Sequence, residues 1–224
     1  MQRVMFVVAH PDDETLMGGG LISLIHRTGM SAVAVVTLAS KAEARSTGSG
    51  PEKIAAKQKN VFEKMNILDW NYDGRDSNLV NEDHLAMVQF VENCILKWKP
   101  DIIITHYPLD THKDHQVTSQ VVSEAFRYFQ RPAGLSPCKE LWYGEVPSST
   151  DWTVAEQFHP NVWIQLTQED IQTKIDLLKM YDQVLRRAPH PRSEENIEAL
   201  ARTRAAQCGG AKYAEAFQQV FRVL

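Results

Sequence analysis

The chain of 224 residues is 43% hydrophobic and 23% charged, a composition that excludes disordered, collagen-like and coiled-coil proteins and suits one substantial domain with a hydrophobic core. Lysine and arginine number 24 against 28 aspartate and glutamate, so the formal net charge is -4. This charge is too small for a surface that binds a polyanion, and we expect no nucleic-acid partner.

Cysteine use and the first residues bear on the compartment. The three cysteines, Cys94, Cys138 and Cys208, are odd in number and far apart, which favours a reducing compartment over a disulfide framework. The apolar part of residues 1–9 is too short for the hydrophobic region of a signal peptide or for a membrane span. We therefore expect a cytoplasmic protein without a membrane span. No repeat or linker divides the sequence, so residues 1–224 are expected to form a single domain.

The predicted elements alternate between strands and helices along most of the chain. Continuous apolar runs rich in β-branched residues predict buried strands, and apolar residues at helical spacing predict helices. In chain order we expect a strand at 3–9, a helix at 16–26, a strand at 31–38, helices at 51–66 and 82–99, a strand at 101–105, a helix at 116–130, strands at 140–146 and 161–166, and helices at 168–186, 193–207 and 212–222.

This alternation predicts an α/β fold with a Rossmann-like, doubly wound and mostly parallel sheet and with helices on both faces. In such sheets ligands bind beyond the carboxyl ends of the strands. The segment 39–50 follows the second strand and is small, polar and glycine-bearing, so we expect it to be a loop over that site.

Two polar clusters follow two of these strands immediately. Residues 10–14 (H-P-D-D-E) come after the first strand, and residues 106–115, with three histidines and two aspartates, come after the strand at 101–105. His10 and Asp13 are three residues apart, as are the last two histidines of the second cluster. A turn or a helix start can aim such pairs at one point.

Imidazole nitrogen and carboxylate oxygen together suit zinc or a similar borderline cation, and three protein ligands leave a coordination position for water. This is the pattern of a catalytic metal site. A lone histidine after a strand is more often a capping or core residue, and we keep that interpretation for His26, His84 and His106 taken singly. The acids at 12–14 could instead stand at the start of the following helix, where the helix dipole favours negative charge, but this interpretation does not explain His10.

At these residues the sequence resembles the PIG-L/LmbE family of metal-dependent N-acetyl-sugar deacetylases. The family's signatures are an A-H-P-D-D-E segment after the first strand and a later H-x-D-H segment, which residues 9–14 and 112–115 match in full. Residues 212–217 (K-Y-A-E-A-F) look like the family's closing Y-A-E-A-F element, so the resemblance spans nearly the whole chain. It implies an LmbE-like form of the predicted fold.

The resemblance also implies roles for the motif residues. His10, Asp13 and His115 would bind zinc, Asp12 would be the general base, and His112 would face the reacting carbonyl. Elementary chemistry favours the same division, because a carboxylate beside the metal can accept a proton from water whose pKa the metal has lowered. An imidazolium on the opposite side can stabilise the oxyanion and protonate the leaving amine.

Asp114 is expected to orient His112 by a hydrogen bond to its other ring nitrogen, with Asp110 as the alternative. The expected cofactor is Zn²⁺, and Fe²⁺ or another divalent ion stays open because the ligand set does not select against it. The glycines at 18–20 lack the spacing of a nucleotide-binding loop, so we expect them to allow close helix packing.

Four residues outside the motifs are candidates for substrate contacts. Arg45 lies in the polar loop at 39–50, and Trp152 could stack on a sugar ring. His190 and Arg192 could meet a diphosphate or a carboxylate. The alternative is an ordinary turn around Trp152 and a charged helix terminus near Arg192.

The sequence therefore predicts a metal-dependent hydrolase that removes the acetyl group from an N-acetylated amino sugar, free or linked to a nucleotide, lipid or glycan. Its expected partners are this small-molecule substrate and copies of itself in a homo-oligomer. Two alternatives stay open. A metal-dependent phosphohydrolase would use Asp12 and Asp110 as ligands of a second metal, and a non-catalytic nucleotide-sugar-binding module would use the same fold without chemistry.

Overall fold

A seven-stranded sheet runs through the computed structural model, which describes residues 2–41, 51–130, 136–154, 156–181 and 183–224. The strand order is β3-β2-β1-β4-β5-β7-β6. The first five strands in this order are parallel, and β7 is antiparallel to both of its neighbours. The mostly parallel α/β sheet is thereby confirmed. The strands are β1 (Gln2–Val8), β2 (Ser31–Thr37), β3 (Asp69–Tyr72), β4 (Ile102–His106), β5 (Glu140–Gly144), β6 (Val162–Leu166) and β7 (Tyr213–Arg222).

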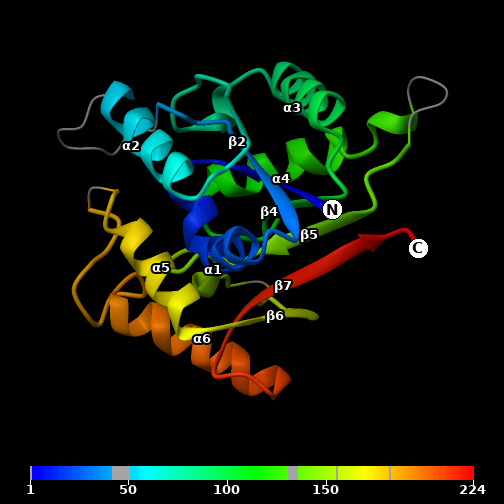
Figure 1. Ribbon diagram of the computed structural model, residues 1–224. Helices are drawn as coiled ribbons and strands as arrows, with labels where there is room; N and C mark the ends of the chain where they lie inside the picture. The colour runs from blue at the N-terminus through cyan, green and yellow to red at the C-terminus, as the bar shows by residue number, and fades with distance from the viewer. Residues whose placement is uncertain (1, 42–50, 131–135, 155, 182) are drawn as a thin grey trace.

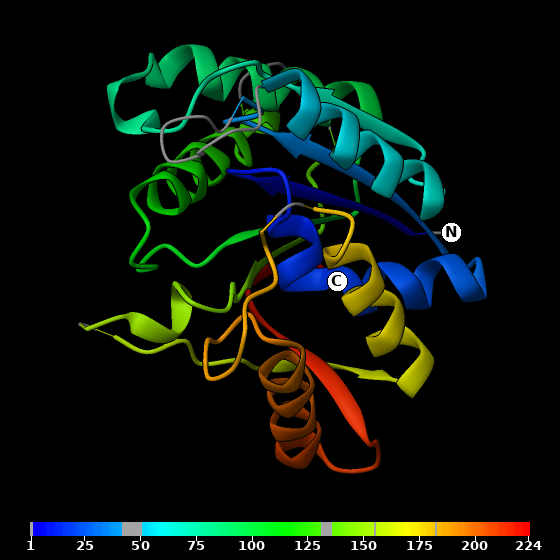
Figure 2. The same cartoon turned by 90° about the vertical axis from the view of Figure 1, so that its left-hand side faces the viewer.

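Helices cover both faces of the sheet (Figure 1). One apolar core lies beneath α1, α2, α5 and α6, and a second core lies beneath α3 and α4. Figure 2 shows α6 beside β7 at the end of the molecule away from α3. None of the helices within the described residues is long and apolar enough to cross a membrane. The helices are α1 (Asp13–Thr28), α2 (Pro51–Lys64), α3 (His84–Trp98), α4 (Lys113–Ala125), α5 (Gln168–Leu178) and α6 (Glu194–Cys208).

Two predicted elements differ from the structure. The predicted helix at 212–222 is wrong, because this segment is β7 and pairs with β5 on one side and β6 on the other. Its alanines, glutamate and glutamines have no strong strand preference of their own, so the pairing and the burial in the sheet decide the conformation. The predicted helix at 168–186 ends at Leu178, and the short edge strand β3 was not predicted.

The place of the two polar clusters follows from the strand order. The chain runs from β1 outward through β2 to β3 and then returns to β4 on the other side of β1. The loops after β1 and β4 therefore diverge at the point where the order reverses, and ligands of open α/β sheets bind in that crevice. Parallel pairing of β1 with β4 brings their carboxyl ends to one edge of the sheet.

Three successive glycines in α1 allow close packing, as predicted. Gly18 has φ -142° and ψ 19°, which interrupts the helix. A Cβ atom at Gly20 would lie 2.4 Å from Leu166 and 3.0 Å from the carboxyl carbon of Glu215. The backbone N–H groups of Gly20 and Leu21 donate to Glu215 at 2.9 and 2.7 Å, and Lys174 Nζ lies 2.7 Å from the same carboxylate. The Y-A-E-A-F element therefore holds α1 against β7.

We expect Gly18→Ala to destabilise the protein. A Cβ atom there would lie 2.5 Å from Phe6 Cε1, in the middle of the buried core. Such overpacking costs about 1–3 kcal/mol, and each kcal/mol lowers the Tm of a protein of this size by about 2–4 °C. Gly144→Ala is the control with a milder contact, because the nearest atoms to its Cβ would be those of the Met17 side chain, at 3.0 Å and beyond. Equal Tm values for both variants in thermal denaturation would contradict this account.

Candidate active site

The two polar clusters meet at the carboxyl ends of β1 and β4. His10 stands in the turn between β1 and α1, and its ring centroid lies 4.8 Å from that of His112. His115, in the first turn of α4, stacks on His112 at 4.7 Å and on His106 at 3.9 Å. Four histidines from segments about one hundred residues apart thus surround one point.

The carboxylate of Asp13 lies at the centre of this group. Its Oδ2 is 3.3 Å from His10 Nδ1, 3.3 Å from His115 Nε2 and 3.4 Å from His106 Nε2. Asp13 is only 1% exposed. Although burial opposes its ionisation, the charge of His115 and the hydrogen bonds of His10 and His115 hold the pKa of Asp13 well below its usual range. Asp13 is therefore a buried carboxylate with several imidazole neighbours.

Carboxylates hold the outer nitrogens of two of these rings. His10 Nε2 lies 2.9 Å from Asp114, and His115 Nδ1 lies 3.2 Å from Asp110. The inner nitrogens, His10 Nδ1 and His115 Nε2, both face Asp13. A carboxylate behind each imidazole is the usual arrangement around metal-ligating histidines, because it fixes the tautomer and orients the ring.

The donor atoms suit a divalent cation. Two groups of side chains have ligand atoms within 4.8 Å of one another: His10, His112 and His115 in one, and Asp13, His106 and His115 in the other. The predicted ligands, His10, Asp13 and His115, take members from both groups. Tetrahedral zinc with bonds of about 2.0–2.1 Å needs ligand atoms about 3.3 Å apart. Both histidine nitrogens meet this separation from Asp13 Oδ2.

The nitrogen of His106 that faces Asp13 is already engaged in a hydrogen bond. Its Nε2, the atom nearest Asp13, accepts a hydrogen bond of 2.9 Å from the backbone N–H of Ala9. Burial and the nearby charge of His115 lower the pKa of His106 to about 3, so the ring is neutral. This observation agrees with the interpretation of His106 as a core residue, and it leaves His10 as the better third ligand.

We expect metal binding to strengthen as the pH rises. Burial opposes the charged forms, but hydrogen bonds and charges from Asp114 and Asp13 raise the pKa of His10 to about 9, and Asp13 and Asp110 raise that of His115 to about 10. Both rings are then protonated near neutral pH and must lose a proton to bind a cation, so the affinity should rise by up to about 100-fold per pH unit below pH 9.

Calorimetry of Zn²⁺ binding in buffers of different ionisation enthalpy measures the protons released on binding. Close to two protons per metal at pH 7 are expected. No proton release at that pH would show that the two imidazoles are already neutral without metal.

Asp110 ties the second cluster to the segment after β5. Its carboxylate accepts hydrogen bonds from Ser149 Oγ at 3.0 Å, from Thr150 Oγ1 at 2.6 Å and from the backbone N–H of His112 at 2.8 Å. The hydrogen bond and charge of His115, together with the bonds from Thr150 and the His112 N–H, outweigh burial and lower the pKa of Asp110 to about 2. Sequence reasoning did not identify Ser149 or Thr150 as partners, although both lie in a hydroxyl-rich stretch.

Asp12 occupies a strained position beside the ligand atoms. Its backbone has φ 115° and ψ -27°, a left-handed conformation that costs a non-glycine residue about 1–3 kcal/mol. Burial and the neighbouring charge of Asp13 raise the pKa of Asp12 to about 7, against the opposing charge of Arg192. A carboxylate with such a pKa can accept and return a proton near neutral pH.

The structure corrects two expectations for His112. The Asp114 carboxylate contacts His10, and it is the backbone N–H of Asp114 that donates to His112 Nδ1, at 3.2 Å. The difference arises because His112 is the N-cap residue of α4, where its side chain accepts from the first turn. Burial and the charge of His115 lower the pKa of His112 to about 4, so its ring is neutral instead of the expected imidazolium.

Of the four predicted substrate-contact residues, the structure places Arg192 beside Asp12. Arg192 Nη1 lies 3.7 Å from Asp12 Oδ2, and its Nε donates to Ser148 Oγ at 2.8 Å. His190 Nδ1 accepts from the backbone N–H of Arg192 at 3.0 Å, so it supports this turn. Trp152 is 65% exposed, at the end of the short helix that begins at Thr150. Arg45 lies outside the described residues.

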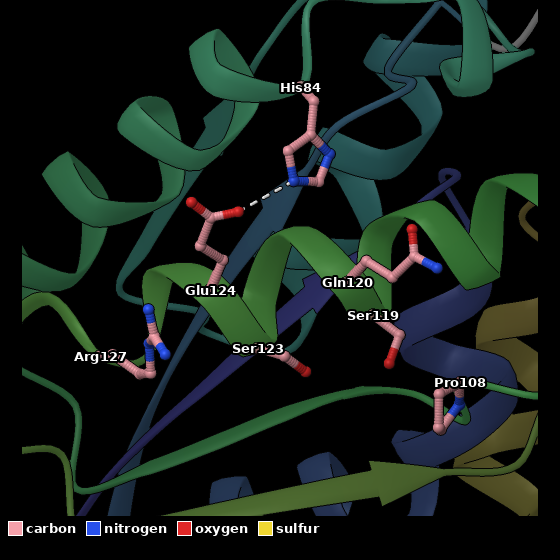
Figure 3. A pocket seen from close by; sticks show the side chains of 7 residues that line it. All are labelled: His84, Pro108, Ser119, Gln120, Ser123, Glu124 and Arg127. Carbon is pink, nitrogen blue, oxygen red and sulfur yellow. Dashed lines mark hydrogen bonds and ion pairs between the residues drawn. The ribbon is translucent and has the colours of Figure 1, made fainter.

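An open groove also lies along the outer side of α4 (Figure 3). His84 and Glu124 pair there, with His84 Nε2 3.1 Å from the carboxylate. None of the residues that line this groove belongs to the histidine and aspartate cluster. The lining residues are His84, Pro108, Ser119, Gln120, Ser123, Glu124 and Arg127.

Comparison with known proteins identifies the family. Residues 5–126, more than half of the chain, match the family model described as PIG-L, GlcNAc-PI de-N-acetylase. The chain belongs to the PIG-L family. This confirms the resemblance seen in the A-H-P-D-D-E and H-x-D-H motifs, and both motifs lie inside the matched region. No curated protein gives a significant match to the sequence.

Several solved structures share the fold of this PIG-L chain at low sequence identity. The conserved protein TT1542 from Thermus thermophilus has 19% identity and a TM-score of 0.78, over 100% of this chain and 97% of that one. GalB, the 4-carboxy-2-hydroxymuconate hydratase from Pseudomonas putida, has 17% identity and a TM-score of 0.77, over 100% and 98%. N,N'-diacetylchitobiose deacetylase from Pyrococcus horikoshii has 16% identity and a TM-score of 0.77, over 98% and 84%.

Proposed function

We propose that the protein is a metal-dependent N-deacetylase that hydrolyses the acetamide of an N-acetylated amino sugar or of its nucleotide-, lipid- or glycan-linked conjugate. One observation carries the proposal. Two imidazoles are held from behind by Asp114 and Asp110, and their inner nitrogens face Asp13. Asp12, with a pKa raised to about 7 by burial and by Asp13, stands beside them as a proton acceptor.

The donor set supports a metal held by His10, Asp13 and His115. When bound there, a divalent cation polarises the scissile carbonyl and lowers the pKa of the attacking water. Zn²⁺ is the proposed ion because it suits nitrogen and carboxylate ligands, and each of the two nitrogens lies 3.3 Å from Asp13 Oδ2. A related structure is described as the zinc inhibited form of teicoplanin deacetylase Orf2. Fe²⁺ is the alternative that metal reconstitution would test.

Asp12 is proposed to carry out the proton transfers, and His112 is proposed to stabilise the developing negative charge. Asp12 takes a proton from water as its oxygen adds to the acetyl carbon, and it returns that proton to the amine nitrogen as the C–N bond breaks. The products are acetate and the free amino sugar. His112 is neutral with Nδ1 as acceptor, so its Nε2–H is the proposed donor to the oxyanion.

Two other functions are less well supported by the geometry. A phosphohydrolase with two metals would need oxygen atoms of Asp110 as ligands, but this carboxylate already accepts from Ser149, Thr150 and His112. A hydratase is the other alternative, because GalB shares the fold. Membership of a de-N-acetylase family and a base placed beside the metal ligands favour amide hydrolysis.

Arg192 is the substrate contact that we carry forward. Two backbone or hydroxyl acceptors, Pro147 O and Ser148 Oγ, fix its Nε, so its outer nitrogens are directed near Asp12. A guanidinium held in this way suits a hydroxyl, phosphate or carboxylate on the substrate. Stacking by Trp152, contacts of His190 and Arg45, a homo-oligomer and a cytoplasmic location stay predictions.

Acetate release tests the proposed function directly. The purified protein is incubated with N-acetylglucosamine, N,N'-diacetylchitobiose, a nucleotide-linked N-acetylglucosamine and a lipid-linked one, with and without a chelator. We expect acetate from at least one substrate, loss of activity with chelator and recovery with one metal. The Asp12→Asn variant controls for contaminating activity. Absence of acetate from all four substrates after metal loading, together with water addition to an unsaturated acid, would favour the hydratase.

A further inference from the structure

The third acid of the A-H-P-D-D-E motif, Glu14, takes no part in the proposed metal site. It is fully buried, and four hydrogen-bond donors converge on its carboxylate. Oε1 accepts from Tyr181 Oη and Thr15 Oγ1, both at 2.7 Å. Oε2 accepts from Gln58 Nε2 at 3.1 Å and from the backbone N–H of Asp12 at 3.3 Å. An ionised carboxylate is the group whose lone pairs such a set of donors fits.

The bond to Asp12 connects Glu14 with the strained turn. The left-handed Asp12 is restrained on its carboxyl side, because its C=O accepts from the N–H groups of Thr15 and Leu16 at 3.0 and 2.8 Å. On its amino side, Glu14 accepts the N–H. A strained conformation persists only where its surroundings hold it, and here a buried side chain supplies one of the two restraints.

Two of the four donors to Glu14 come from parts of the chain far from the motif. Tyr181 follows α5 and is 5% exposed, and Gln58 belongs to α2 and is completely buried. Gln58 Nε2 also donates to Thr37 Oγ1, at the end of β2, at 3.1 Å. Gln58 and Tyr181 therefore hold, from two sides, the carboxylate that accepts the Asp12 N–H.

We propose that Glu14 and Tyr181 are positioning residues, which hold the backbone of Asp12 so that its carboxylate points at the attacking water. The role in the reaction rests on the proposed function, since it supposes that Asp12 is the base. Glu14 itself touches neither substrate nor metal. The loss of Tyr181 Oη would leave Thr15 Oγ1 as the donor to Oε1 and would loosen the hold on the carboxylate that accepts the Asp12 N–H.

Hydrogen exchange tests the restraint without any need for activity. In Glu14→Gln the Asp12 N–H meets either a neutral amide oxygen in place of a carboxylate or, if the side chain is turned over, an opposing N–H group, so the bond to Asp12 weakens or breaks. We expect exchange of the Asp12 amide, followed by NMR, to become at least about tenfold faster in Glu14→Gln and in Tyr181→Phe. Unchanged exchange in Tyr181→Phe would overturn the proposal, even if Glu14→Gln does not fold.

Two control variants make the same kinds of substitution at buried positions away from Asp12. Glu215→Gln alters a buried carboxylate that accepts from α1 at Gly20 and Leu21, away from Asp12. Tyr213→Phe removes a hydroxyl that donates to Glu198 at 2.7 Å. Both should leave the exchange rate of the Asp12 amide within about twofold of the wild type. Acceleration as large as in Tyr181→Phe would show a general loosening and would refute the specific restraint.

A double-mutant cycle tests whether the restraint acts through Asp12. Tyr181→Phe should lower kcat about tenfold with KM and metal content unchanged, and it should cause no further loss in an Asp12→Asn background. Equal losses in both backgrounds would exclude action through Asp12. If the wild type releases no acetate from any substrate, the proposed function fails, whereas the exchange measurement still decides whether Glu14 holds Asp12.

Discussion

Asp12→Asn is expected to lower kcat for acetate release by about 100- to 10,000-fold, the range that a general base contributes. Asparagine has nearly the same shape but cannot accept the proton of the attacking water. Metal content should stay at the wild-type level, because Asp12 is in neither group of close ligand atoms. The measurements are steady-state kinetics and metal analysis of the same preparation.

The pH profile separates a missing base from a damaged site. Asp12 must be ionised to act, and burial with the charge of Asp13 raises its pKa to about 7 in the metal-free protein. Wild-type kcat/KM should therefore rise with pH on the acidic side of the profile. The pKa of this rise should be below 7 when the cation is bound, because a nearby positive charge favours the ionised carboxylate. Asp12→Asn should lose this rise. An Asp12→Asn protein that keeps its metal and full activity would eliminate Asp12 as the base.

His115→Ala is expected to abolish both metal binding and activity. His115 belongs to both groups of candidate ligands, and its Nε2 lies 3.3 Å from Asp13. Its loss should weaken Zn²⁺ binding by more than the roughly 10- to 100-fold that the loss of an outer hydrogen-bond partner costs. Asp110→Asn, which removes such a partner, should give the smaller effect. Titration of metal-free protein with Zn²⁺ compares the two variants.

Substitution of the two neighbouring histidines distinguishes the two possible ligand sets. His10→Ala should lose the metal, whereas His106→Gln should keep it, because the lone pair of His106 Nε2 is used by the Ala9 N–H. His106→Gln should instead lower stability by about 1–3 kcal/mol, since His106 is fully buried. The opposite result, metal retained in His10→Ala and lost in His106→Gln, would assign the second group of ligands.

Much of the fold could be predicted from local sequence. The apolar runs of β1, β2 and β4 are rich in valine and isoleucine, which suit strands buried on both faces. The segment of β7 offered no such signal, and the predicted helix there was wrong. Its strand conformation depends on pairing with β5 and β6, and both partners are distant in the sequence.

The chemical content of the candidate site was also accessible from the sequence, because an imidazole or a carboxylate carries its donor atoms wherever it lies. The order of His10, Asp12 and Asp13 after one strand and of His112 and His115 after another placed them at one edge of the sheet. The pairing of each carboxylate with its imidazole could not be predicted from the sequence. Asp114 is adjacent in sequence to the His112 cluster, yet its carboxylate reaches His10, 104 residues away.

The sequence alone thus determined the family, the set of donor atoms and their place beyond β1 and β4, since these depend on residue type and strand order. Only the tertiary structure decided the partners and the protonation of each group. Hydrogen-bond direction and burial depend on neighbours from the whole chain, as when Tyr181 and Gln58 close around Glu14. The same surroundings make His112 neutral and hold Asp12 in its left-handed turn.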